Sequence, residues 1–117
     1  MIGSIENSYL IGQGEDREIV FEIEDTQNVL TETDTILFAM ADIDKDIKYK
    51  YSQSVENLPK ENNIYTFVVT LSSQLTNSFD IKTYFFDITL IKGDEKIQLL
   101  KPKSLTIVKT IGASSEV

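Results

Sequence analysis

The sequence contains no cysteine and no histidine. Without cysteine the chain has no disulfide, no thiol nucleophile and no thiolate metal site. Without histidine it lacks the commonest general base near neutral pH and the commonest ligand of transition metals. Most catalytic and metal-binding arrangements are therefore excluded, and we expect a protein that is not an enzyme and that needs no cofactor.

Basic residues are also scarce. Eleven lysine and arginine residues against nineteen aspartate and glutamate residues give a formal net charge of −8 and a pI near 4.4. This is the wrong sign for binding a phosphate backbone, so we expect no nucleic-acid partner. No apolar run approaches the roughly 20 residues of a membrane-spanning helix, and residues 1–6 lack the basic start and apolar run of a signal peptide. We expect synthesis in the cytoplasm and no membrane partner.

What the sequence does have is a regular alternation of apolar and polar residues. With 41% apolar residues, 117 residues can form one core without covalent support. Alternation with a period of two predicts strands. The expected strands are 5–11 at a sheet edge, 17–24, 35–41, 47–51, 64–71, 84–91, 95–100 and 105–111. We expect a single domain over residues 1–111, followed by a flexible tail or linker over 112–117.

Turn-forming residues separate these strands. The Asp-rich segment 42–46 predicts a hairpin, and Gly93-Asp94 predicts a two-residue turn of the primed type. Residues 54–63 form the longest polar connection and are interpreted as a loop. One short helical turn is expected near 72–79. Lys101-Pro102-Lys103 interrupts the alternation and predicts a break between the last two strands.

These elements predict an all-β fold, an antiparallel β-sandwich of seven or eight strands. Asp80, Tyr84 and Phe86 resemble the immunoglobulin signature, in which an Asp precedes a Tyr by four residues and the Tyr stands two residues before a core Cys. The resemblance implies an immunoglobulin-like sandwich in which the Tyr84 hydroxyl bonds to upstream backbone, as in a tyrosine corner. The alternative is that Tyr84 is an ordinary strand aromatic.

Asp42, Asp44 and Asp46 have a spacing that suggests a metal site, because alternate carboxylates supply oxygen ligands in calcium loops. A calcium loop also needs Gly at its sixth position and Glu at its twelfth, where this chain has Ile47 and Gln53. We therefore interpret the segment as a solvated hairpin tip and predict no metal site. A weak cation site at the three aspartates is the alternative.

Some predicted strands carry apolar residues on both faces. Phe85 and Ile91 lie on the face opposite Tyr84 and its apolar neighbours, and Val68 and Val108 similarly oppose the main apolar faces of their strands. A strand that is apolar on both sides must be covered on both sides. Either other segments of the same chain cover these four residues, or the residues belong to a subunit interface.

The order of features along most of the chain resembles that of one family. The segments concerned are Gly14-Glu15-Asp16, IVFEIED, LTETDTILFAM, YTFVVTLSSQLT and YFFDITLIKGDEKIQLLKPKSLTIVKT. Together they resemble the N-terminal immunoglobulin-like domain of phage baseplate upper proteins and related small tail domains of tailed phages and prophages. The residues that match the pattern are Tyr84, Asp87, Ile88, Leu90, Gly93, Leu99, Leu100 and Val108.

The resemblance implies a phage or prophage structural protein, a tail or baseplate module that binds other tail proteins and copies of itself. Such a protein would be located in the virion after synthesis in the cytoplasm of the bacterial host. The alternative is an immunoglobulin-like or carbohydrate-binding module of a larger surface protein. That module would recognise its ligand through the loop 54–63, with Tyr49 and Tyr51 as candidate solvent-facing aromatics.

Overall fold

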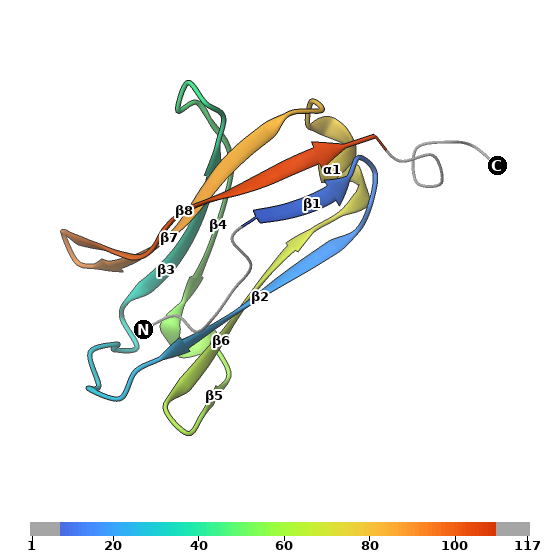
Figure 1. The fold of residues 1–117 in the computed structure, drawn as a ribbon. Coiled ribbons are helices and arrows are strands. Elements are labelled where there is room, and N and C mark those ends of the chain that lie inside the picture. Colours follow the sequence, from blue (N-terminus) through green and yellow to red (C-terminus); the bar gives the residue numbers. More distant parts are fainter. Residues whose placement is uncertain (1–7, 110–117) are drawn as a thin grey trace.

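The structure is a computed structural model that describes residues 8–109, and it consists of two packed β-sheets (Figure 1). The elements are β1 (Ser8–Gly12), β2 (Arg17–Glu24), β3 (Thr35–Ala41), β4 (Ile47–Ser54), η1 (Val55–Asn57), β5 (Lys60–Glu61), β6 (Ile64–Leu71), α1 (Ser73–Ser78), β7 (Thr83–Lys92) and β8 (Glu95–Val108). One sheet has the strand order β1-β8-β7-β3-β4, and the other has the order β2-β6-β5. β1 pairs with β8 in parallel, and every other strand pair in the described chain is antiparallel.

This strand order is that of an immunoglobulin-like sandwich. In such a domain the strands named B, E and D form one sheet, the strands C, F and G form the other, and C′ can extend the second sheet beside C. Here β2, β6 and β5 take the places of B, E and D. The strands β3, β7 and β8 take those of C, F and G, and β4 takes that of C′. The predicted all-β sandwich is confirmed.

The strand positions follow from the alternation of residue types. β2, β3 and β6 begin and end at the residues that the sequence predicts. In β2 the residues Ile19, Phe21 and Ile23 are buried, whereas Glu18 and Glu22 are exposed. One face of each sheet therefore supplies the core, and the other is left for solvent or for a partner.

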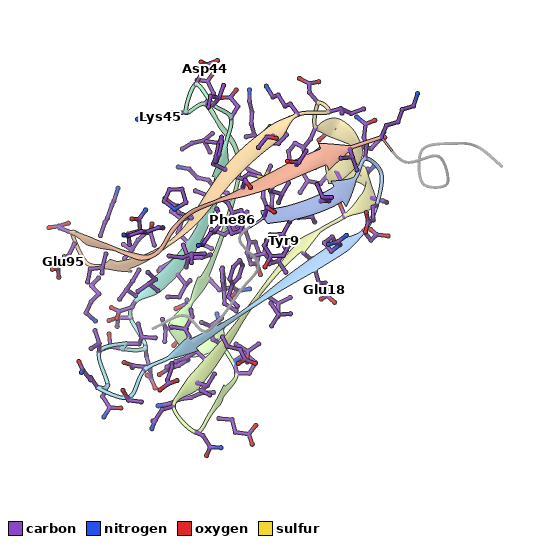
Figure 2. The ribbon with its side chains drawn as sticks, viewed as in Figure 1. Tyr9, Glu18, Asp44, Lys45, Phe86 and Glu95 are labelled. Carbon is purple, nitrogen blue, oxygen red and sulfur yellow. The ribbon has the colours of Figure 1, made fainter. Side chains whose placement is uncertain are left out.

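A cluster of aromatic rings joins the two sheets. The Phe86 ring lies 5.2 Å from that of Phe38, 6.0 Å from that of Phe21 and 5.8 Å from that of Tyr9, measured between centroids. Figure 2 labels Tyr9 and Phe86, which lie together in the interior of the sandwich. Phe86 stands where the immunoglobulin signature has its second Cys, and Phe21 faces it from the opposite sheet. Ring packing takes the place of the inter-sheet disulfide.

Tyr84 forms a tyrosine corner. Its hydroxyl donates a hydrogen bond of 3.1 Å to the carbonyl oxygen of Asp80, four residues upstream. The side chain is buried, and its ring lies 5.6 Å from that of Phe79 between centroids. The corner predicted from the immunoglobulin signature is confirmed, because an ordinary strand aromatic would lack this bond to the preceding turn.

The expected helical turn near 72–79 is the helix α1. Ser72 caps it, since the Ser72 Oγ accepts a hydrogen bond of 3.2 Å from the backbone N–H of Leu75. The buried Thr76 hydroxyl donates to the carbonyl of Glu15 at 2.7 Å and accepts from the N–H of Gly14 at 3.0 Å. These bonds attach the helix to the loop between β1 and β2.

The hairpins are where the sequence predicts them. β3 and β4 are joined across residues 42–46, and β7 and β8 are joined by Gly93-Asp94, with Lys92 paired to Glu95. Gly93 has φ of +59°, as the first position of a primed turn of type II′ requires. The predicted edge strand is confirmed over residues 8–12, where β1 forms the edge of the five-stranded sheet. The predicted tail 112–117 lies outside the described residues.

The predicted break at Lys101-Pro102-Lys103 is wrong, because β8 runs through it as one strand. Phe86 pairs with Lys103 and Ile88 pairs with Leu100, so β8 has one more residue than β7 between these pairs. This bulge contains Pro102. A proline lacks an N–H group and is tolerated where the ladder is already interrupted, so the strand bends at Pro102 without ending there.

The interpretation of residues 54–63 as a plain loop is incomplete. The segment contains the 3-10 turn η1 and the short strand β5, whereas the sequence predicted only one helical turn. Val55 and Leu58 are buried and anchor it to the core. Asn62 and Asn63 have φ of 52° and 64°, which is the backbone of a type I′ turn, and they connect β5 to β6.

Candidate docking surface

An apolar groove lies on the outer face of the five-stranded sheet, the face turned away from β2, β5 and β6. It encloses a volume of about 470 Å³. The apolar residues that line it are Ala39, Ala41, Ile43, Ile47, Phe85, Phe86 and Pro102. Asp42, Lys45 and Asp87 also line it. We call the surface formed by eight of these residues, all except Asp42 and Phe86, the groove face.

The register of the strands creates the hollow. Ala41 of β3 pairs with Phe85 of β7 on one side and with Ile47 of β4 on the other, so a methyl group lies between two large side chains. Ala39 is the next outward residue on β3, and it pairs with Asp87. Because these two outward positions of β3 are both alanine, little side-chain volume covers the middle strand. The larger side chains of the flanking strands β4 and β7 form the walls of the hollow.

Two large aliphatic side chains project beside this hollow. Ile43 is 74% exposed and Ile47 is 54% exposed. Both belong to the hairpin between β3 and β4, whose tip carries Asp44 and Lys45 and projects beyond the body of the sheet (Figure 2). Exposed aliphatic groups next to an apolar groove are typical of an interaction surface and not of isolated surface residues.

The structure separates the four residues that the sequence proposes as an interface. Phe85 lines the groove, whereas Ile91 lies further along the same outer face, paired with Thr35 and Lys96. Val108 is at the other end of β8, opposite Gly12. All of these apolar residues remain partly exposed, so the described part of the chain does not cover them fully.

Val68 belongs to a different surface. It is on β6, paired with Val20 of β2, which is 52% exposed. Glu18, Glu22 and Glu24 lie on the same outward side of β2 and are exposed. We call the surface formed by these three residues with Val20 and Val68 the glutamate face. It lies on the opposite side of the sandwich from the groove face.

Sequence reasoning missed most of the groove. Ala39 and Ala41 alternate with the buried residues of β3, and this pattern does not distinguish the floor of a hollow from a filled surface. Ile43 and Ile47 carried a usable signal, because each is a large aliphatic residue within or beside an Asp-rich turn. The hollow itself depends on the pairing of β3 with β7, which the sequence did not specify.

Asp42 organises the hairpin tip through contacts of both its carboxylate oxygens. Its Oδ1 accepts hydrogen bonds of 3.0 Å from the N–H groups of Asp44 and Asp46. Its Oδ2 lies 3.7 Å from the ammonium groups of both Lys48 and Lys82. Burial would raise the pKa of Asp42, but these hydrogen bonds and charges outweigh it and hold the pKa below its ordinary value.

Asp44 and Asp46 are exposed, as expected of a solvated hairpin tip, whereas Asp42 is buried. In residues 8–109 no group of three acidic side chains is placed to hold a metal ion.

Tyr49 and Tyr51, the candidates for solvent-facing aromatics, are half-buried and do not form an exposed pair. Their rings pack on the core, Tyr49 against Phe38 at 6.2 Å and Tyr51 against Phe67 at 5.8 Å between centroids. Burial raises the pKa of Tyr49, and the nearby Tyr51 hydroxyl raises it by a smaller amount. Both tyrosines are on the inner side of β4, because their partners Met40 and Phe38 on β3 point inward.

The strands of the two sheets differ in charge. On the strands of the five-stranded sheet lysines outnumber acidic residues, whereas on those of the three-stranded sheet glutamates outnumber basic residues. The former are Lys48, Lys50, Lys92, Lys96, Lys101 and Lys103 against Asp87 and Glu95. The latter are Glu18, Glu22, Glu24 and Glu61 against Arg17 and Lys60. The groove therefore lies on the less acidic side of a strongly acidic chain.

Within the part of the chain that the structure describes, no helix is both long and apolar enough to cross a membrane. A scan of protein-family models, a search of curated proteins and a search of solved structures each returned no match for this chain.

Proposed function

We propose that the protein is a structural module of a phage or prophage tail or baseplate, and that it acts through protein–protein contacts. The observation that carries this proposal is the groove face, an apolar hollow flanked by exposed aliphatic residues on a protein of net charge −8. Burial of such a surface against a partner is favourable, because it removes apolar area from water. The phage setting rests on the sequence resemblance to baseplate upper proteins.

The groove suits binding better than chemistry. Its lining is mostly aliphatic and aromatic, and the charged groups in it are Asp42, Lys45 and Asp87. Asp42 is already bonded to the backbone of its own loop, and Asp87 accepts a hydrogen bond of 3.2 Å from Gln98. A pocket of this composition excludes water from a partner's apolar side chain and fixes its orientation with few charges.

A carbohydrate-binding module is less well supported. Sugar recognition needs aromatic rings that face solvent, and the candidates Tyr49 and Tyr51 pack against Phe38 and Phe67. The loop 54–63 that would carry the ligand is anchored by buried Val55. We therefore favour a protein partner.

The proposal is tested in the phage or prophage that encodes the chain. We expect mass spectrometry of purified particles to detect the protein among the tail components. Deletion of its coding region should give particles that lack an assembled tail, as seen by negative-stain electron microscopy, and a plasmid copy should restore them. If purified particles lack the protein and the deletion leaves the infectious titre unchanged, the proposal is wrong.

A further inference from the structure

On the premise of the proposed function, we infer that the groove face binds the same face of a second copy of this chain across a two-fold axis. Three features of the described residues point to this occupant: the shape of the face, the charges within it, and the charge of the opposite face.

The shape of the groove face is self-complementary. It presents a projection, Ile43 and Ile47, directly beside a hollow, Ala39 and Ala41. In a two-fold contact each residue that inserts into the partner is matched by the same residue of the partner inserting in return. One rotation therefore places the isoleucines of each copy against the alanines of the other, and both projections are buried at once.

The charges of the groove face also match under the same rotation. Lys45 is exposed at the hairpin tip (Figure 2) and makes no ion pair within the described residues. Asp87 lies on β7 beside Ala39. When Ile43 of one copy reaches the alanine floor of the other, the neighbouring Lys45 is carried toward Asp87 of that copy. Symmetry then produces the pair twice.

The opposite face of the sandwich is unsuited to self-association. Glu18, Glu22 and Glu24 form a row of exposed carboxylates on β2. Bringing two copies together through this row would oppose like charges, which is unfavourable. The groove face carries both signs of charge, and although Asp44 and Asp46 are exposed at the same hairpin tip, a second copy can pair Lys45 with Asp87 there.

The sheet is large enough for such a contact. Seven residues of β3 extend about 23 Å, and five strands spaced about 4.8 Å apart extend about 24 Å, which gives a flat footprint of about 550 Å². Accessible surface exceeds a flat footprint, and a standard interface buries about 800 Å² for each partner. A dimer of standard size would thus use most of the outer face and not the groove residues alone.

The test is the molar mass of the whole chain, measured by sedimentation velocity and light scattering over a concentration series. We expect a monomer–dimer equilibrium with no larger species. Ile43→Lys should raise the dimer dissociation constant by about tenfold or more, because it places a charge in a desolvated contact. Val20→Lys is the matched control, since it makes the same change at an exposed aliphatic residue of the glutamate face, and it should leave the constant unchanged.

A charge exchange tests the symmetry of the contact. Lys45→Glu and Asp87→Lys should each raise the dissociation constant about three- to tenfold, because each single change opposes like charges at both copies of the pair. The double variant restores opposite charges with their places exchanged, and we expect its constant to return to within about twofold of the wild-type value. Circular dichroism and thermal midpoints identify any variant that has lost its fold, and the remaining variants then decide the outcome.

A chain that stays monomeric at about 1 mM overturns the inference, as does open-ended association or a dimer that Val20→Lys disrupts and Ile43→Lys does not. These outcomes are separable from failure of the proposed function. If the protein is a monomer but is found in tails, the proposed function holds and the groove binds another tail protein. If the protein forms the symmetric dimer but is absent from tails, the inference about the groove holds and the proposed function is wrong.

Discussion

At the scale of single residues, hydrogen bonds across short sequence distances fix the points where the chain changes direction. Tyr84 holds the turn before β7 through its bond to Asp80, and Asp25 holds the turn after β2 by accepting from the N–H groups of Val29 and Leu30 at 2.8 and 3.0 Å. Asp25 is buried, and its carboxylate replaces the strand partners that these two amides lack. Such residues are structural although their types also occur in active sites.

Tyr84→Phe should remove the corner hydrogen bond and preserve the ring packing. We expect the free energy of unfolding to fall by about 0.5–1.5 kcal/mol, measured by urea denaturation. Tyr49→Phe is the control, because the Tyr49 hydroxyl makes no hydrogen bond within the described residues, and it should change the stability much less. Equal losses in the two variants would contradict a special role for the corner.

Protonation of Asp34 in acid should lower the stability of the protein. Burial would raise its pKa, but the Lys92 ammonium at 2.5 Å and the N–H of Thr31 at 2.9 Å outweigh burial and hold the pKa below its ordinary value. A pKa that is lower in the folded state gives stability that is present above the ordinary value of 3.8. This stability is lost as the pH falls through the folded-state pKa.

Urea midpoints measured from pH 7 to pH 2 should therefore fall at the acid end. Asp34→Asn should lower the midpoint at neutral pH and flatten the fall. Glu22→Gln removes an exposed carboxylate of β2 and should leave the wild-type profile unchanged. The assignment is wrong if Asp34→Asn and the wild type lose stability in parallel over the whole range.

At the scale of elements, strand positions could be predicted wherever one face is buried and one is wet. β2, β3 and β6 alternate strictly and have the predicted bounds. The primed turn at Gly93 and the corner at Tyr84 were also predictable, because each requires a particular residue type at a fixed place. Alternation, turn type and the tyrosine corner each depend on a few neighbouring residues, so they can be predicted from the sequence.

The errors arose where pairing decides the structure. Pro102 indicates a break when it is considered alone, but a bulge opposite β7 accommodates it within β8. β5 consists of two residues and exists because β6 offers it a partner. Tyr49 and Tyr51 were candidates for solvent-facing aromatics, although the bulge between β3 and β4 and the register beyond it place both rings on the inner side. The groove depends on the same pairing and was not predictable.

Gly93→Ala should weaken the hairpin between β7 and β8. Space is not the obstacle, because a Cβ at this position would meet no atom within 4 Å. The cost comes from the backbone, since φ of +59° is unfavourable for a residue with a Cβ by about 1–2 kcal/mol. Thermal unfolding should show a loss of that size. Gly93→Asn should lose less, because asparagine tolerates positive φ better, and a larger loss for Asn than for Ala would refute this explanation.

At the scale of the whole molecule, neighbouring residues of β7 serve different purposes because they face opposite ways. Phe86 is in the aromatic cluster between the sheets, and Phe85 lines the groove. Phe86→Ala should reduce the free energy of unfolding by about 3–5 kcal/mol, a large share of the roughly 5–15 kcal/mol that a domain has.

Phe85→Ala should cost much less stability, because its ring is already partly exposed, and it should instead weaken dimer formation. Chemical denaturation and sedimentation of the two variants provide the comparison. If Phe85→Ala destabilised the monomer as strongly as Phe86→Ala, the outer face would belong to the core and not to an interface.

The parallel pairing of β1 with β8 also determines how the module bears mechanical load. Ser8 pairs with Ser104 and Gly12 pairs with Val108, so the first and last described strands run side by side in one direction. Tension applied to the two ends of the chain pulls these strands past each other along their length. The ladder is then loaded in shear, and its hydrogen bonds resist together instead of opening one after another as in a zipper. A tail component that transmits force would gain mechanical strength from this arrangement without a covalent cross-link.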